Sequence, residues 1–515
     1  MSQAPVNSTS HRNYVLRILE HLESDPARIV VRSWKKNLTA DEFHTSVVCA
    51  ARALTRAGVR PADTVAVLTE PNCAAMLAAR YAGHLLGAAV VHIRSMNARS
   101  DAEELPAAEQ VRLLRATGAR VLAVDGPLLT RGDELRAQVR DLTVVTLAGT
   151  APYEGEGAPP AVSYAPDDLA VVDLTSGTTG TPKLVRRSFG VRDRLVDLSF
   201  GAAAPEHRPT LLSVTPISHA TATMVDAALV AGGTVVLHDG FRLPDVLRAL
   251  TEEGVTDLYL AVPHLYQLVD HPGIEEADFP ALRQVLYSGT VAAPSRVARA
   301  VEVFGDVLAQ LYGSTEAGGM CTLTPLDHRE PELLGSVGRP FPWVEMEIRP
   351  PGSDEPVEGT EPGEVCVRSP TLMDGYLDDE DRTGPTVRSG WLRTGDLGHW
   401  DRYGYLRLLG RIGSVVKVNG IKVHPATVQN VLLQHADVAD CAVYGVRGAG
   451  NVEGLEAAVQ PRAGRRCTTE ELRDHVAARL SPAHVPDSFS WWEEIPLGPS
   501  GKPDTVILGE RKKAQ

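Results

Sequence analysis

The sequence predicts an α/β fold, and three observations lead to it. Apolar residues alternate between helical spacing and short continuous runs through the first third of the chain. Further strand-like runs stand at 233–237 and 284–287. From about Glu364 the pattern changes to short β-like runs separated by turns. Because strands separated by helices form parallel sheets through right-handed crossovers, we expect a parallel-rich body followed by a smaller β-rich and α+β part.

The first elements follow from the spacing of apolar residues. Val47, Val48, Ala51 and Leu54 are spaced as on one face of a helix. After them we expect a strand at 64–68, a helix at 74–86 and a strand at 89–93.

Segments from residue 150 onward indicate a connection, two further strands and a small terminal unit. Residues 150–166 are rich in Pro, Gly and Ala without periodicity, which is typical of a surface connection. Runs at 364–368 and 404–409 predict strands. The last hundred or so residues are typical of a small α+β unit, whose helix begins with Thr468 and Glu471 in capping-box spacing.

Length and composition limit the classes of protein. The 515 residues, 43% of them hydrophobic, are enough for at least two domains. The net charge of −14 works against nonspecific binding to nucleic acids or anionic membranes. The N-terminus lacks an apolar signal core, and Arg80, His84 or Asp226 interrupts the longest apolar stretches before membrane-spanning length. We therefore expect a cytoplasmic protein without nucleic-acid or membrane partners.

The six cysteines are widely scattered and form no CxxC pair. Neither a zinc site nor a disulfide framework is predicted. We expect reduced, mostly buried thiols.

The most informative motif follows the apolar run 169–172. It reads Leu174-Thr175-Ser176-Gly177-Thr178-Thr179-Gly180-Thr181-Pro182-Lys183. Glycine lets the main chain approach an anion, hydroxyls add donors, and the lysine supplies a positive charge, so the pattern favours a polyphosphate site. The spacing is not that of the common P-loop, in which glycine directly precedes lysine. Taken alone, the segment also fits a flexible linker.

The order TSGTTGTPK resembles the phosphate loop of the adenylate-forming superfamily, which contains acyl-CoA synthetases, firefly luciferase and nonribosomal-peptide adenylation domains. Later motifs match the same superfamily in order and spacing from roughly Leu38 to Lys502. The resemblance implies an N-terminal adenylation domain, residues 1–410, of parallel-rich sheets with flanking helices and a β-barrel-like subdomain. It also implies a small mobile α+β C-terminal domain, residues 411–515.

The resemblance implies a nucleotide site. In the second signature, 312–318, Tyr312 would pack on adenine, Thr315 would contact the α-phosphate and Glu316 would hold Mg²⁺. Asp396 would accept hydrogen bonds from both ribose hydroxyls, and Arg411 would bind ribose. The full implied set of nucleotide-binding residues is Thr175, Ser176, Gly177, Thr178, Thr179, Gly180, Ser288, Gly289, Thr290, Tyr312, Gly313, Ser314, Asp396, Arg411 and Lys417.

Each later motif has a structural alternative when taken alone. The second signature also fits a plain turn with a buried tyrosine, and Asp396 fits an Asx-turn after an edge strand. Lys502, in the turn Pro499-Ser500-Gly501-Lys502, would ordinarily be a solvated surface residue. The resemblance instead makes it the lysine that reaches the substrate carboxylate and the α-phosphate.

The implied catalytic residues are Lys183, Thr315 and Lys502. Lys183, Lys502 and Mg²⁺ would neutralise ATP while a carboxylate attacks the α-phosphorus. Pyrophosphate leaves, and the acyl-adenylate is then ready for attack by a thiol.

One departure from the family pattern concerns the second half of the reaction. The hinge position, usually Asp or Lys, is Gly413. Glycine absorbs large dihedral changes but makes no side-chain contacts that favour either end state. Leu184, Thr427 and Gln429 also depart from the family pattern.

The segment 215–224 resembles the start of the acyl-pocket helix. His219 stands where amino-acid-activating domains carry an aspartate, so an amino acid is disfavoured. The histidine is either a gate on the carboxylate side of the pocket or a structural residue at a helix start. Small residues around it and in the facing loop predict a roomy pocket for a bulky ring-containing acid: Ala220, Thr221, Ala222, Thr223, Gly318 and Gly319.

These observations predict an acyl-CoA synthetase that uses ATP, Mg²⁺ and coenzyme A. A composition rich in Ala, Arg and Val resembles that of actinomycete proteins and points to secondary metabolism. There is also a resemblance to tailoring ligases that activate polycyclic terpenoid acids of the platencin type. Two alternatives stay open: adenylation with transfer by another protein or to a carrier-protein thiol, and a catalytically silent relative that binds nucleotide or acid. A homodimer is a further open alternative.

Overall fold

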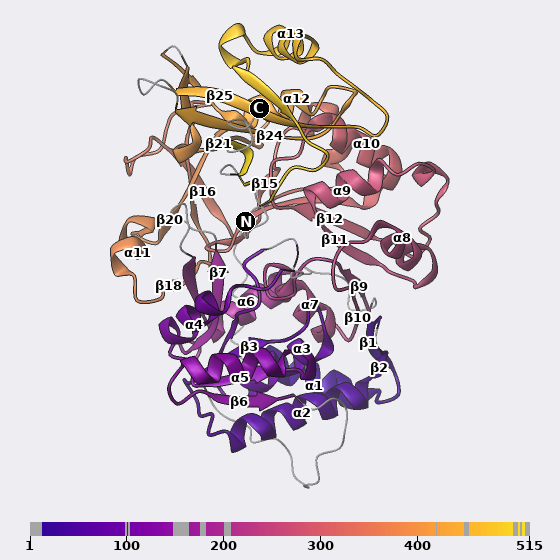
Figure 1. Ribbon diagram of the computed structural model, residues 1–515, viewed down its shortest axis with the longest axis vertical. Coiled ribbons are helices and arrows are strands. Elements are labelled where there is room, and N and C mark those ends of the chain that lie inside the picture. Colours follow the sequence, from indigo (N-terminus) through magenta and orange to yellow (C-terminus); the bar gives the residue numbers. More distant parts are fainter. Residues whose placement is uncertain are drawn as a thin grey trace, which may run out of the picture. The chain divides into compact units, whose positions relative to one another are not determined.

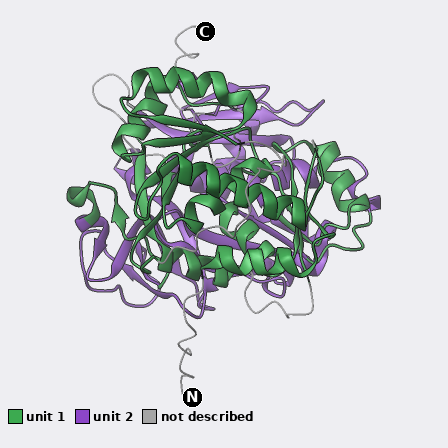
Figure 2. Ribbon diagram, turned by 90° about the horizontal axis from the view of Figure 1, so that it is seen from below, with its two compact units in different colours: residues 1–259, 278–283, 370–383 green, residues 260–277, 284–369, 384–515 purple. Residues whose placement is uncertain are grey.

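The computed structural model describes residues 13–34, 36–97, 100, 103–147, 164–175, 182–199, 208–418, 420–447, 453–497, 503–504 and 507–509 (Figure 1). The chain forms two compact units, coloured separately in Figure 2. Unit 1 comprises residues 1–259, 278–283 and 370–383, and unit 2 comprises 260–277, 284–369 and 384–515. Neither unit begins or ends at residue 410. The boundary of a mobile C-terminal domain at that residue stays a prediction.

The larger sheet of unit 1 has the strand order β18-β8-β7-β4-β3-β5-β6. Its parallel part runs from β7 to β6, whereas β8 and β18 join in antiparallel pairs. The predicted strands at 64–68 and 89–93 are confirmed as β3 and β4, the second one residue shorter. The bounds are β3 (Thr64–Leu68), β4 (Ala89–His92), β5 (Val121–Val124), β6 (Thr143–Thr146), β7 (Leu169–Thr175), β8 (Lys183–Ser188) and β18 (Gly375–Tyr376).

Helices of unit 1 pack with apolar faces inward. α2 begins with a capping box between Thr39 and Glu42, and its predicted apolar face is buried. α3 is buried on nearly all sides, although it carries Arg80 and His84. The bounds are α1 (Tyr14–Ser24), α2 (Ala40–Arg56), α3 (Ala74–Leu85), α4 (Ala107–Ala116), α5 (Leu129–Gln138), α6 (Phe189–Ser199), α7 (Thr221–Val230) and α8 (Leu243–Glu252).

Unit 1 contains further parallel strands. β10 (Thr234–Leu237) lies between β9 (Thr210–Ser213) and β1 (Ile29–Ser33), parallel to both. β2 (Leu38–Thr39) pairs with β1 in the antiparallel direction, and β11 (Asp257–Ala261) begins parallel to β9. The predicted strand at 233–237 is thus confirmed, one residue shorter.

Unit 2 also contains a parallel pair of strands that continues into antiparallel pairs. β12 (Gln284–Ser288) is parallel to β13 (Leu308–Ser314), which continues as an antiparallel pair with β14 (Gly318–Leu323). β15 (Arg339–Pro340) pairs with β14, and α9 (Val262–Val269) and α10 (Pro294–Phe304) complete this part. The predicted strand at 284–287 is confirmed as β12.

An antiparallel sheet follows, with the order β16-β17-β20-β19 and with β21 paired to β20. The predicted run at 404–409 begins two residues before β21, because Gly404, at φ 77°, ends a turn held by the Asp401 carboxylate. The bounds are β16 (Glu345–Arg349), β17 (Gly363–Arg368), α11 (Glu380–Thr386), β19 (Val387–Arg388), β20 (Trp391–Trp400) and β21 (Leu406–Arg411).

The last part of unit 2 is a small α+β arrangement. The capping box of Thr468 and Glu471 is confirmed at the start of α13, which buries Leu472 and Val476. The strand order is β24-β25-β26 beside the β22-β23 pair. The bounds are β22 (Val416–Val418), β23 (Ile421–Val423), α12 (Pro425–Leu432), β24 (Val438–Arg447), β25 (Glu453–Pro461), α13 (Thr469–Arg479) and β26 (Ser488–Trp491).

These elements confirm the predicted fold class. The predicted surface connection at 150–166 lies outside the described residues except for its last three. All six cysteines are described; five are buried, Cys73 is half-buried, and none of the six is in a disulfide. No helix in the described part of the chain combines the length and the apolar character needed to cross a membrane.

Candidate active site

The predicted phosphate loop connects two antiparallel strands. β7 ends at Thr175 and β8 begins at Lys183, and these two residues face each other in the ladder. Ser176, Gly177, Thr178, Thr179 and Gly180 lie between them, outside the described residues. The predicted strand before the loop is confirmed as β7.

Lys183, the first residue of β8, is held by an aromatic residue. Its Nζ lies 3.3 Å from the Tyr376 hydroxyl oxygen and 5.1 Å from the centre of the Tyr376 ring. Tyr376 is almost fully buried on β18, which pairs with β8. A cation over a ring face is attracted by the ring quadrupole, so the contact orients the lysine. Sequence reasoning missed Tyr376 because it stands 193 residues from Lys183.

The segment 215–220 leads directly into α7, which begins at Thr221. The hydroxyl oxygens of Thr215 and Thr221 lie 2.6 Å apart, and Thr223 Oγ1 donates to the carbonyl of Ala220 at 3.0 Å. The predicted substrate residues Ala220 and Thr223 are therefore joined across the helix start. Thr223 is half-buried and Ala220 is exposed.

His219 presents a buried nitrogen that has no hydrogen-bond partner among the described residues, Nε2. Burial lowers the pKa of His219, while Asp173 and a hydrogen bond with the Ser95 backbone oppose that shift. The imidazole is thus neutral near pH 7, with Nε2 available to a ligand.

In unit 2 the second signature forms the turn between β13 and β14. Gly313 faces Gly319 and Ser314 faces Gly318, so residues 315–317 form the tip. A Cβ on Gly313 would lie 2.4 Å from the Gly318 carbonyl oxygen, and Gly318 itself has φ 74°. Both positions require glycine. The predicted catalytic Thr315 and metal ligand Glu316 lie at the tip, both half-buried.

Three predicted nucleotide-binding residues meet in unit 2. The Tyr312 hydroxyl donates to Asp396 Oδ2 at 2.7 Å, and Arg411 Nε lies 3.0 Å from Asp396 Oδ1. Asp396 and Arg411 are ladder partners on β20 and β21. Burial, together with the Asp396 carboxylate, raises the pKa of Tyr312 well above its ordinary value, so the phenol stays a donor.

The segment 288–290 follows β12, next to the strand that carries Tyr312. Because β12 and β13 are parallel, their carboxyl ends lie at one edge of the sheet, where ligand sites of α/β sheets are found. Ser288 is buried, Gly289 has φ 102° and Thr290 is exposed. The structure therefore places 288–290 and Tyr312 at the same edge.

Gly319 leaves less free space than the sequence suggests. A Cβ there would lie 3.2 Å from both Leu311 Cδ1 and Phe341 Cε2. This glycine admits the packing of Phe341, whose ring stacks on Trp343 at 4.7 Å. The substrate role of Gly318 and Gly319 stays a prediction.

The predicted hinge glycine and one of the two predicted C-terminal lysines lie in the described part of the chain. Gly413 lies in a short 3₁₀ helix, Ile412–Ser414, and a Cβ there would meet no atom within 4 Å. Lys417 is exposed on β22. Lys502 lies outside the described residues, but Leu497 and Pro503 on either side of its turn form a β-bridge.

A single predicted carboxylate, Glu316, is compatible with a magnesium ion held jointly with a nucleotide. Within the described ranges, no three His, Cys, Asp or Glu side chains gather as a complete metal cage. Mg²⁺ bound with ATP needs only one or two carboxylates because phosphates and waters fill its other positions. Glu316, on a turn beside Thr315, is suited to that part.

Comparisons with known proteins place the chain in a family. The AMP-binding enzyme family matches residues 19–377, and the AMP-binding enzyme C-terminal domain matches residues 427–502. The chain belongs to the AMP-binding enzyme family. The predicted membership of the adenylate-forming superfamily is thereby confirmed.

Individual relatives agree with this placement. A feruloyl-CoA synthase of an Amycolatopsis species is 31% identical over 95% of this chain and 96% of its own. The amide bond synthetase McbA of Marinactinospora thermotolerans is 34% identical, with a TM-score of 0.86 over 97% of this chain and 99% of its own. The O-succinylbenzoate coenzyme A synthetase MenE of Bacillus subtilis, in complex with ATP and a magnesium ion, is 26% identical, with a TM-score of 0.80 over 95% and 98% of the two chains.

At the level of the family, the predicted enzyme class is confirmed as an AMP-forming acid–thiol ligase. The predicted use of ATP, Mg²⁺ and coenzyme A is confirmed at the same level. The roles of individual residues stay predictions.

Proposed function

We propose that this AMP-binding enzyme joins ATP to a bulky ring-containing carboxylic acid and transfers the acyl group to coenzyme A, as a step of secondary metabolism. The observation that carries the nucleotide part is the cluster of Tyr312, Asp396 and Arg411, three residues that separate motifs assign to one nucleotide. The names of two relatives, feruloyl-CoA synthase and O-succinylbenzoate coenzyme A synthetase, support a ring-containing acid. The platencin-type acid remains one member of the class to be tested.

The first half-reaction forms the mixed anhydride. A carboxylate oxygen attacks the α-phosphorus, the bond to the bridging oxygen breaks, and pyrophosphate leaves. Lys183, oriented by Tyr376, and Lys502 would offset the charge that builds up, and Thr315 would donate to the α-phosphate. Mg²⁺, held through Glu316, would neutralise the phosphates when bound.

The second half-reaction consumes the anhydride. The thiol sulfur of coenzyme A attacks the carbonyl carbon, and the bond to AMP breaks. In the preceding half-reaction, neutral His219 would stand at the acid, since a protonated imidazole would hold the carboxylate away from phosphorus. The hinge at Gly413 would serve the movement between the two halves.

A second acceptor is supported by a specific observation. The match to an amide bond synthetase extends over nearly the whole chain at 34% identity, and Gly413 lacks the side chain usual at the hinge. An enzyme that adenylates the acid and passes the acyl group to an amine, or to a carrier-protein thiol, fits both facts.

One experiment separates these functions. Purified protein is incubated with ATP, Mg²⁺ and a panel of aromatic, polycyclic and straight-chain acids, and acid-dependent pyrophosphate exchange is measured. Acids that respond are then offered coenzyme A, simple amines and a holo carrier protein, and the products are identified by mass spectrometry. A CoA thioester of a ring-containing acid is the expected result.

Other outcomes contradict the proposal. An amide or a carrier-bound acyl group without CoA thioester would assign the second acceptor. Exchange restricted to straight-chain acids would refute the ring-containing substrate. No exchange with any acid would favour a catalytically silent relative.

A further inference from the structure

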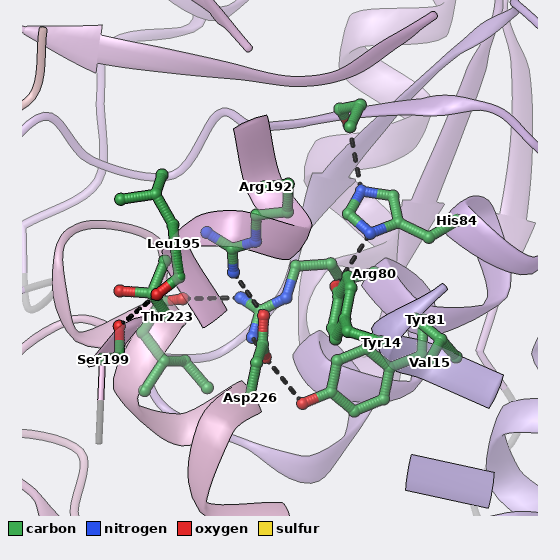
Figure 3. A network of polar contacts seen from close by, with 12 residues as sticks. Tyr14, Val15, Arg80, Tyr81, His84, Arg192, Leu195, Ser199, Thr223 and Asp226 are labelled. Atoms are coloured by element: carbon green, nitrogen blue, oxygen red, sulfur yellow. Dashed lines mark hydrogen bonds and ion pairs between the residues drawn. The ribbon is translucent and has the colours of Figure 1, made fainter. Parts of the chain in front are cut away.

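A buried carboxylate connects helices α3, α6 and α7 of unit 1 (Figure 3). Asp226 on α7 is 0% exposed, and Arg80 on α3 and Arg192 on α6 are 2% and 3% exposed. Asp226 Oδ1 accepts hydrogen bonds from Arg80 Nη2 at 2.6 Å and from the Tyr81 hydroxyl at 2.7 Å. Oδ2 accepts one from Arg192 Nη2. Two guanidinium groups thus share one carboxylate in the interior.

Stability alone does not account for this network. Removing charges from water is costly, and apolar residues of similar volume often stabilise a core as well or better. Burial by itself would raise the pKa of Asp226, but Arg80, Arg192 and the Tyr81 hydroxyl bring it below its ordinary value. The carboxylate therefore stays ionised and directs both guanidinium groups.

The second arm of Arg80 extends to the loop before α7. Its Nη1 donates to the carbonyl oxygen of Ile217 at 2.7 Å. The Ile217 N–H donates to Asn72 Oδ1 at 2.9 Å, and Asn72 Nδ2 donates to the Thr215 carbonyl at 2.9 Å. Both backbone groups of Ile217 are therefore held by side chains from distant parts of the sequence.

This loop carries His219 two residues after Ile217, directly before the start of α7. Arg80 donates hydrogen bonds on both sides of His219: to Ile217 in the loop and to Asp226 within α7. A guanidinium is suited to this because its donors are fixed in one plane, so the position of one partner sets the position of the other.

We propose that Arg80, oriented by Asp226, is a positioning residue for acid recognition, because it sets the loop 215–220 and with it the imidazole of His219. The proposal rests on the proposed role of His219 at the acid. Arg80 itself does not touch substrate.

Arg192 provides a matched control. It is as buried as Arg80, binds the other oxygen of the same carboxylate, and lies with its guanidinium carbon 5.8 Å from the centre of the Tyr14 ring. No hydrogen bond joins it to the loop 215–220 among the described residues. Replacing either arginine by lysine keeps a cation beside Asp226, but only Arg80→Lys removes the bond to Ile217, since an ammonium cannot span both partners.

The first measurement is steady-state kinetics of both variants. Arg80→Lys is expected to raise the KM for the acid about tenfold, as for the loss of one charge-assisted hydrogen bond, with the KM for ATP unchanged. Arg192→Lys is expected to change the KM for the acid less than about twofold. Equal changes in both variants, or a rise in both KM values of Arg80→Lys, would overturn the proposal.

The second measurement does not depend on the reaction. Hydrogen exchange followed by mass spectrometry is expected to show faster exchange of peptides that cover 214–221 in Arg80→Lys, and wild-type exchange there in Arg192→Lys. Faster exchange in both or in neither would overturn the positioning. Faster exchange in Arg80→Lys with an unchanged KM for the acid would overturn the link to recognition.

A second variant and the activity of the wild-type protein complete the test. If thermal unfolding shows that Arg80→Lys is unfolded, Asn72→Gly removes the other contact to Ile217 while permitting the φ of 41° at that position, and the same two effects are expected. A wild-type protein without acid-dependent pyrophosphate exchange would refute the proposed function, and the exchange of peptides 214–221 would still decide the positioning.

Discussion

At the scale of single residues, the environment decides what each ionisable group can do. Lys183 is a cation placed over a buried aromatic ring, and His219 is an imidazole kept neutral by burial. Neither property follows from the residue type alone. Both depend on the folded surroundings: Tyr376, distant in the sequence, holds the lysine, and burial lowers the pKa of the histidine against the opposing effects of Asp173 and Ser95.

Lys183→Ala is expected to lower acid-dependent pyrophosphate exchange about 100-fold or more, because a charge aimed at the developing transition state is lost. Tyr376→Phe keeps the ring and is expected to lower the exchange rate less than about threefold, since the ring face supplies most of the attraction. Lys36→Ala, which removes an exposed lysine paired with Glu42 at 2.7 Å, is the control and is expected to match wild type. Equal losses in Lys183→Ala and Lys36→Ala would contradict the role of Lys183.

The buried His84 predicts a pH dependence of stability. Burial, aided by Arg192 and Arg80, lowers its pKa to about 3, and the ring accepts from the Tyr14 hydroxyl at 2.8 Å while lying 3.0 Å from the Ala170 carbonyl. The folded state keeps this ring neutral, whereas the unfolded chain protonates it below its ordinary pKa. The free energy of unfolding should therefore fall as pH drops below about 6.5, by about 1.4 kcal/mol per pH unit for this group.

Urea unfolding at several pH values between 7 and 4.5 measures this loss. His84→Gln removes the titrating ring, so its free energy of unfolding should depend less on pH than that of wild type. Parallel pH curves for the two proteins would show that His84 does not contribute.

At the scale of elements, two antiparallel strand pairs hold residues that are predicted to contact phosphate. β7 and β8 bring Thr175 opposite Lys183, and β13 and β14 expose the tip at 315–317. The tight turn of the second pair depends on Gly313, because a side chain there would collide with backbone that cannot move away.

Gly313→Ala is expected to lower the free energy of unfolding by about 1–3 kcal/mol, since its Cβ would lie 2.4 Å from the Gly318 carbonyl oxygen. Gly413→Ala is the matched control, because a Cβ there would meet no atom within 4 Å, and a change of less than about 1 kcal/mol is expected. Denaturant unfolding of both variants provides the comparison. If Gly413→Ala were the more destabilised, close packing at Gly313 would not limit the stability of the turn between β13 and β14.

The sequence predicted many of these elements closely. Apolar spacing gave strands 64–68 and 89–93 and the capped helix after Thr468, because burial of one face and capping leave local signals. The sequence offered one indication of the network around Asp226, namely that Arg80, His84 and Asp226 interrupt apolar stretches. Their partners lie up to 146 residues away, so local pattern could not identify them.

At the scale of the whole molecule, the proposed function requires the chain to move between two half-reactions. The proposed hinge at Gly413 stands after β21 with open space around it. A side chain is therefore tolerated at this position, and its effect on activity reports on the hinge rather than on packing.

Gly413→Asp is expected to leave pyrophosphate exchange near the wild-type rate and to raise CoA-dependent thioester formation about fivefold, because a side chain restores contacts that favour an end state. Gly413→Ala serves as the control that changes backbone freedom alone. If both variants formed thioester at the wild-type rate, residue 413 would not be the hinge, and the adenylation-only alternative would gain support.

By itself, the sequence determined the α/β class, the family and the positions of its motifs, because periodic burial and glycine-rich turns are encoded locally. Tertiary structure decided which residues meet: Asp396 with Tyr312 and with Arg411, Lys183 with Tyr376, and Arg80 with both Asp226 and Ile217. The physical reason is that contacts between distant segments depend on how helices and strands pack. Packing is a property of the assembled core and not of any one stretch of sequence.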